Sequence, residues 1–289
     1  FRFGKWPRDI LARCFCILAL DRFGDYSGEC LDNDNVDYVD IAPVRSASAE
    51  VLALLFRISS CQSLQASCLS ILKTFSTNNN HWEIRHGSIL VIKYILSVAD
   101  DFNMQVQNDF FERAALRCLL DINDDVKSVC ANVLSSIVNG VKIKSLETEC
   151  FKKFVAKASQ NIWRVLQTIT SVASCRKDVL QCLTDLCIVD SATVLSNIVS
   201  IDESEFGLSE LMQSLCVFMD DASPSIQVSC LNTISLIIEP SLDTMLVYID
   251  TKKRYSSLLN TLCSLLVKLF DSFLNCDSID DIKDEEESM

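Results

Sequence analysis

The sequence predicts an all-α protein in which antiparallel helix pairs stack in a row. Apolar residues make up 49% of its 289 residues, whereas Gly (6) and Pro (4) are scarce, and sheet proteins with many tight turns use more of both. Apolar residues recur at steps of three and four, as in Leu208, Leu211, Leu215 and Phe218, which is the spacing of one helix face. A short pattern also returns along the chain at a nearly regular interval. The first two observations predict helices with short connections, and the third predicts their stacking.

The recurring pattern is a polar turn, an aliphatic residue, a long polar residue, small residues and then a helical apolar run. Its copies align on five aliphatic residues: Val44, Ile84, Val126, Val172 and Ile226. These lie 40, 42, 46 and 54 residues apart, and a period of roughly 40–47 residues made of helix pairs is typical of HEAT or armadillo arrays. We expect a HEAT-repeat solenoid in which each aligned residue lies near the start of the second helix of a pair and points inward.

Other amphipathic segments lie between the repeated ones and supply the first helix of each pair. They are residues 64–75, 110–120, 150–165, 208–218 and 256–273. The array is expected to occupy residues 1–275 as about five to six repeats, with an acidic loop insertion at 26–41. Residues 276–289 are expected to form an acidic flexible tail or linker, because like charges resist compaction.

Two helix starts carry recognisable capping patterns. Asn80 with Glu83 three residues later resembles a capping box, in which side chains satisfy orphan backbone N–H groups. Ser223 followed by Pro224 combines a cap with a first-turn proline, which lacks the N–H that would have no partner there.

The histidines of the chain lie together in HWEIRH, residues 81–86. His86 has two interpretations: a general base paired with Glu83 on one helix face, or a packing residue between repeats. No nucleophile, glycine-rich loop or second ionisable group accompanies it, and these are what a catalytic site requires. We therefore favour the packing interpretation and expect no catalytic residue, no metal site and no cofactor.

Fifteen cysteines would suggest disulfides in a small secreted chain. Here the number is odd, no CxxC occurs, and most cysteines sit among apolar residues on helical runs. Cys68, Cys130, Cys182 and Cys230 are examples. We expect buried, reduced thiols, as in a cytosolic or nuclear protein.

The net charge of −13 argues against a wide nucleic-acid-binding surface, because contacts to a phosphate backbone need clustered Lys and Arg. It fits a partner with a basic face, although acidic surfaces also serve solubility alone. No run of about 18 uncharged apolar residues is present, so no membrane span is expected. The first residue is Phe, and the chain is expected to be a soluble piece of something larger.

Four landmarks give the sequence a family resemblance. CILALDRFGDY, IAPVR, HWEIRHGSILVIKYILSV and LLDINDDVKSV occur in this order. They resemble the amino-terminal HEAT-repeat region of the TATA-box-binding protein (TBP)-associated SWI/SNF-type ATPases. The resemblance is strong over residues 6–140, looser over 161–221 and weak beyond 240. The chain departs from the family in its enlarged acidic stretch before Pro43, in lacking the outermost amino-terminal repeats, and in having no G-x-x-x-x-G-K-[ST] phosphate loop.

The resemblance implies a nuclear transcription regulator whose helical array grips TBP while a motor absent from this chain removes TBP from DNA. DNA would be reached only indirectly, through the complex. The inter-helix turns would dock on the basic convex side of TBP, so the acidic turns Asp124–Asp125 and Asp220–Asp221 are candidate contacts. The alternative for these acids is helix capping. Trp82 is either a packing residue or an exposed anchor. The alternative function is a HEAT scaffold or transport adaptor for another partner.

Overall fold

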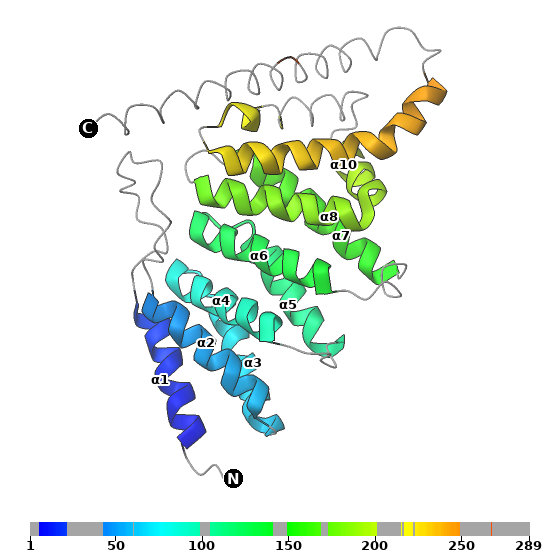
Figure 1. The fold of residues 1–289 in the computed structure, drawn as a ribbon. Helices are drawn as coiled ribbons and strands as arrows, with labels where there is room; N and C mark the ends of the chain where they lie inside the picture. The colour runs from blue at the N-terminus through cyan, green and yellow to red at the C-terminus, as the bar shows by residue number, and fades with distance from the viewer. Residues whose placement is uncertain are drawn as a thin grey trace, which may run out of the picture. The chain divides into compact units, whose positions relative to one another are not determined.

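The computed structural model describes residues 6–21, 43–59, 61–98, 105–140, 149–168, 173–200, 215, 217–221, 223–248 and 267. Within these ranges the regular elements are helices and no strand occurs. The elements are α1 (Trp6–Leu20), α2 (Pro43–Ile58), α3 (Gln62–Ser76), α4 (Trp82–Val98), α5 (Gln105–Cys118), α6 (Asp124–Gly140), α7 (Glu149–Thr168), α8 (Ala173–Ser200), η2 (Phe218–Asp220) and α10 (Pro224–Tyr248) (Figure 1). The all-α prediction is confirmed.

The chain forms two compact units, divided between Asn197 and Ile198. In the first unit α2, α4 and α6 lie side by side in one layer, and α3, α5 and α7 form the second layer (Figure 1). Each of α2, α4 and α6 also packs on the helix that precedes it in the chain. This is the two-layer arrangement of a HEAT-like solenoid. In the second unit η2 packs on α10.

The helix starts agree closely with the sequence pattern. The predicted second helices begin at Pro43, Trp82, Asp124, Ala173 and Pro224. The predicted first helices 64–75 and 150–165 fall within α3 and α7, and 110–120 extends two residues beyond α5. Most of 208–218 and 256–273, as well as the insertion 26–41 and the tail 276–289, lie outside the described residues.

The inward orientation expected of the aligned aliphatic residues is found at only some positions. Val126 and Ile226 are fully buried near the starts of α6 and α10, and Ile84 is half-buried in α4. Val172 lies outside the described residues. The expectation is wrong for Val44, which is 57% exposed.

Val44 is exposed because the face of α2 that carries it has no described helix packed on it. Val51, Leu54 and Ile58 share that face and are exposed as well. α4, by contrast, packs against helices on several sides, namely α1, α2, α3, α5 and α6. On α2 the buried residue at this point is Arg45, with 0% of its surface exposed.

Thiols fill part of the core, as the sequence suggested. Cys68, Cys130, Cys182 and Cys230 are all buried and free of disulfides. Burial raises the pKa of the Cys68 and Cys182 thiols to about 12, so both remain protonated near neutral pH. They act as small apolar side chains in the interior.

α8 is the longest helix described and contains a break. Its segment Cys175–Ile198 is long and apolar enough to cross a membrane by length and composition, but half of its most apolar window is buried inside the protein, as in a core helix. Asp190 has non-helical backbone angles. Its carboxylate accepts a hydrogen bond from the Thr193 backbone N–H at 3.0 Å. Asp190 therefore caps the second half of α8.

Gly87 permits the close approach of α1 and α4. A Cβ atom at this position would lie 3.2 Å from the Cβ and Cδ2 atoms of the buried Leu18. Gly87→Leu should therefore lower the free energy of unfolding by about 1–3 kcal/mol through overpacking. Urea denaturation is the measurement, with Gly140→Leu as control because a Cβ there meets nothing within 4 Å. Equal stability of the two variants would contradict the close contact.

Candidate partner-binding turns

The turn between α3 and α4 is organised by one asparagine. The Asn78 side-chain oxygen accepts hydrogen bonds from the backbone N–H groups of Asn80 and His81, both at 2.9 Å. This is an Asx turn, in which a side chain replaces a backbone acceptor. Asn78 therefore holds the turn, rather than the expected Asn80–Glu83 capping box.

The turn between α5 and α6 uses two such residues in succession. Asp121 accepts a hydrogen bond from the Asn123 N–H at 3.0 Å. Asn123 in turn accepts hydrogen bonds from the N–H groups of Asp125 at 3.0 Å and Val126 at 3.2 Å. Asn123 is thus the N-cap of α6.

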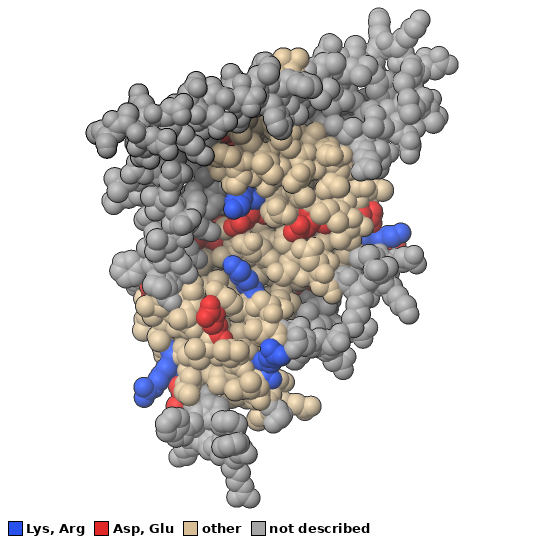
Figure 2. Space-filling model, viewed as in Figure 1, with Lys and Arg blue, Asp and Glu red and all other residues tan. Residues whose placement is uncertain are grey.

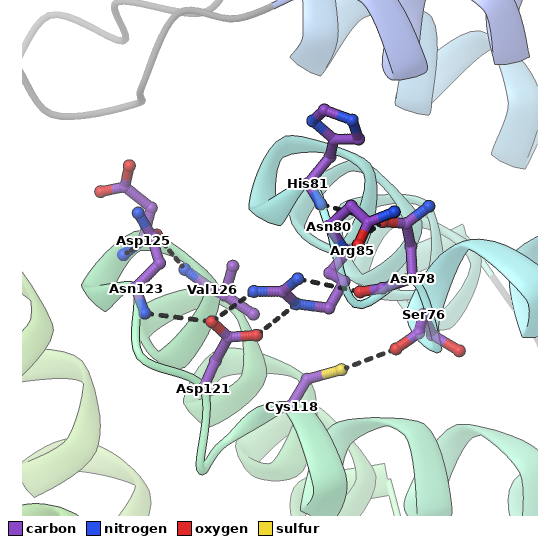
Figure 3. A network of polar contacts seen from close by, with 10 residues as sticks. All are labelled: Ser76, Asn78, Asn80, His81, Arg85, Cys118, Asp121, Asn123, Asp125 and Val126. Atoms are coloured by element: carbon purple, nitrogen blue, oxygen red, sulfur yellow. Dashed lines mark hydrogen bonds and ion pairs between the residues drawn. The ribbon is translucent and has the colours of Figure 1, made fainter.

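Arg85 joins these two turns across the boundary between neighbouring helix pairs (Figure 3). Its Nε and Nη2 donate to the two carboxylate oxygens of Asp121 at 2.5 and 2.7 Å, and its Nη1 donates to the Asn78 carbonyl at 2.9 Å. The hydrogen bonds to Asp121 raise the pKa of Arg85 above its ordinary value. A forked guanidinium can make this two-point contact and a lysine cannot. The two turns are therefore fixed relative to each other.

A second buried cluster connects α2 to α4. Arg45 Nη1 donates to His86 Nδ1 at 3.0 Å, and Nη2 donates to the Asp21 carbonyl at 2.6 Å. Because arginine has only donors, His86 Nδ1 is the acceptor. The Arg45 guanidinium also lies 5.4 Å from the centre of the Trp82 ring, which meets the His86 ring edge-on at 6.2 Å.

These contacts give His86 and Trp82 structural roles. His86 is completely buried, and its ring is engaged between helix pairs, as the packing interpretation predicted. Trp82 is half-buried and forms part of the surroundings of Arg45. Its geometry favours packing over an exposed anchor.

A third cluster connects α6 to α8. Ser128 Oγ donates to the Asp178 carboxylate, and Asn132 Nδ2 donates to the same carboxylate at 3.1 Å. Burial raises the pKa of Asp178 above its ordinary value, while the two hydrogen bonds oppose that rise. A polar group from one helix pair therefore meets the next pair here as well.

The two acids of the α5–α6 turn that were predicted to contact a partner are engaged within the chain. Asp124 lies 2.7 Å from Lys127 Nζ, with 19% of its side chain exposed. Asp125 is buried, with only 8% of its surface exposed. A residue that contacts a partner through its charge would need to be exposed, and Asp125 is not. The reason is that Asn123, and not the first aspartate, occupies the cap position and draws the next residues inward.

In the second unit, Asp220 ends η2, and its side chain is outside the described part. Asp221 is half-buried. Its carboxylate accepts a hydrogen bond from the Ser223 N–H at 2.9 Å, which repeats the Asx turn seen at Asn78 and Asp121.

The surface charge on the layer of α2, α4 and α6 is mixed. Figure 2 shows Lys and Arg close to Asp and Glu at several points of this face, separated by uncharged surface. The net charge of −13 is not gathered on the described part of this face. A partner that docks here would meet both signs of charge.

Sequence reasoning missed the residues that organise the turns, namely Arg85, Asp121 and Asn123. A signal was available. An Asn or Asp precedes three of the repeated helices by three or four residues, at Asn78, Asp121 and Asp221. An aligned Asx of this kind predicts a repeated turn. Which arginine reaches which turn depends on helix packing and could not be read from spacing.

No protein-family model matches the chain. The chain is 26% identical over 256 residues to TATA-binding protein-associated factor 172 of Homo sapiens. The alignment covers 88% of this chain and 12% of the human protein. It is 28% identical over 259 residues to TATA-binding protein-associated factor BTAF1 of Arabidopsis thaliana, covering 81% of this chain and 12% of that one. It is 28% identical over 240 residues to TATA-binding protein-associated factor MOT1 of Saccharomyces cerevisiae. That alignment covers 78% of this chain and 12% of the yeast protein.

Among solved structures, an engineered protein aligns with 80% of the chain at a TM-score of 0.41 and 10% identity, too low to support an argument. The three relatives share one description, and their alignments extend well beyond the four landmarks in the sequence. The chain spans about an eighth of their length. It is therefore similar in sequence to a segment of these TATA-binding protein-associated factors, which confirms the resemblance carried by those landmarks.

Proposed function

We propose that this chain is the part of a nuclear transcription regulator that binds TBP through its inter-helix turns. The observation that carries the proposal is the shared description of the relatives as TATA-binding protein-associated factors. The turns support it, because Arg85 holds two of them in one fixed arrangement. Prearranged contact residues bind with a smaller loss of conformational entropy.

In the parent protein, a motor outside this chain would use the grip on TBP to remove it from DNA. The role of the chain is then that of a binding module with no reaction of its own. DNA would be reached through the complex. The proposal is tested by measuring association of the purified chain with TBP in solution, for example by biolayer interferometry. Saturable binding supports it, whereas no binding at micromolar concentrations would leave the scaffold or transport-adaptor function as the better account.

Asp124, paired with Lys127 and with 19% of its side chain exposed, is the more exposed of the two aspartates that begin α6 and would lie at the rim of such a contact. Asp124→Asn should slow association with TBP and flatten its dependence on salt, because rim charges act chiefly on encounter. Only charges within about 8 Å of the contact act strongly at physiological salt. Stopped-flow association at two salt concentrations is the measurement, with Asp9→Asn as the matched control on the exposed surface of α1. Identical association rates for the two variants would mean that Asp124 pairs with Lys127 and does not act on the encounter with TBP.

A further inference from the structure

The α5–α6 turn presents an apolar tip to solvent. Ile122 is 93% exposed, the largest value among the bulky apolar side chains that the structure describes, and Leu120 in the same turn is 46% exposed. Single exposed apolar residues are normal on protein surfaces, whereas here two bulky aliphatic side chains, two positions apart, are exposed on one turn. The sequence pattern did not single out either residue.

The backbone under this tip is held from both sides. The N–H groups of Leu119 and Asp121 donate to the last turn of α5, at 2.8 Å to Ala115 and 3.0 Å to Cys118. Asp121 is clamped by Arg85, and Asn123 caps α6. Ile122 therefore stands between two fixed residues, so burying it in a partner requires little ordering of the backbone.

The charged groups beside the tip have partners within the chain or are buried. Asp121 pairs with Arg85 and Asp124 pairs with Lys127, while Asp125 is buried. The apolar side chains at the tip are therefore the groups with most to gain from a contact. A few side chains that become fully buried, with a surrounding ring of groups that excludes water, carry most of the binding energy of a protein interface.

We propose that Ile122, assisted by Leu120, is the apolar anchor by which the α5–α6 turn inserts into a hydrophobic recess of its protein partner. The inference rests on the proposed function, and takes TBP as that partner. It assigns the binding energy to the apolar tip and the encounter to Asp124. Arg85 is a positioning residue, because it acts on the contact through Asp121.

The test compares Ile122→Ser with Ile188→Ser in the 289-residue chain, using TBP as the probe. Ile188 is 62% exposed on α8 and is the matched control. Losing a fully buried isoleucine contact should weaken binding by about 10- to 100-fold. The loss should appear as faster dissociation with the salt dependence unchanged, unlike the effect of Asp124→Asn. Ile188→Ser should bind within about twofold of the unaltered chain, since single exposed side chains away from a contact change little.

The outcomes separate the anchor from the proposed function. If the unaltered chain binds TBP and Ile122→Ser binds equally well, the anchor is refuted and the proposed function stands. If the unaltered chain does not bind TBP, the proposed function fails, and the anchor fails with it. Loss of binding in Ile122→Ser counts as support only if its urea midpoint matches that of the unaltered chain, which the exposure of Ile122 predicts. Ile122→Val, which keeps most of the apolar contact, should restore most of the affinity.

Discussion

Replacing Arg45 with alanine should lower the free energy of unfolding of the chain by about 3–5 kcal/mol, the usual cost of breaking a buried ion pair by removing one partner. The Arg45 side chain is 0% exposed, and the Asp21 carboxylate, 3.8 Å from its Nε, is 8% exposed. The variant would leave the Asp21 carbonyl and His86 Nδ1 without the donors they now have. It would also open a space beside Trp82.

Urea denaturation followed by circular dichroism measures this effect. Arg13→Ala, on the exposed surface of α1, removes the same charge without a buried partner and should stay within about 0.5 kcal/mol of the unaltered chain. If both variants lost the same stability, the burial of Arg45 would have no energetic role.

The second large effect is expected at Arg85. Arg85→Ala should also lower the free energy of unfolding by about 3 kcal/mol, because it leaves the Asp121 carboxylate, 6% exposed, without its two-point partner. Arg85→Lys should recover only part of this loss, since an ammonium cannot make both contacts at once.

A double-mutant cycle with Asp121→Ala isolates the pair. The coupling energy should fall between about 0.5 and 3 kcal/mol, the range for residues in direct contact. A coupling near zero would mean that Arg85 stabilises the protein through Asn78 alone. The same variants can be tested for TBP binding. Weaker binding by a variant that is still folded would show that the turn, and not the fold as a whole, has been lost.

The sequence was sufficient to predict the fold class and the helix starts because both depend on local patterns. The run that follows Trp82 and the one that follows Asp124 each repeat apolar residues at helical steps. The helices α4 and α6 begin at those two residues. Capping at the starts of α4 and α6, by contrast, was assigned one or two residues away from its true place, whereas Ser223 does lie directly before Pro224, the first residue of α10. A side chain that can cap is easy to recognise, but which of several neighbouring Asn and Asp residues does so depends on the path of the backbone.

The orientation of side chains and the contacts of the turns were harder to predict, for two reasons. Burial depends on which helix lies opposite, so Val44 and Ile84 have different surroundings despite matching sequence patterns. Arg45 is buried with polar partners from two other segments, and nothing in its local sequence pattern indicates this. Sequence spacing contains no information about pairs that lie 36 or 41 residues apart, such as Arg85–Asp121 and Arg45–His86.

The three polar clusters all cross from one helix pair to the next: Arg45 to His86, Arg85 to Asp121, and Ser128 with Asn132 to Asp178. In a stacked array the stability is approximately a sum of terms within each repeat and terms between nearest neighbours. Directional contacts at each boundary increase the stabilisation between neighbouring helix pairs relative to the stabilisation within each pair. Opening one helix pair then exposes broken contacts on its neighbours, so the first four pairs should melt as a single cooperative block. Such a block would transmit a load applied at one end to the other without losing a repeat in between.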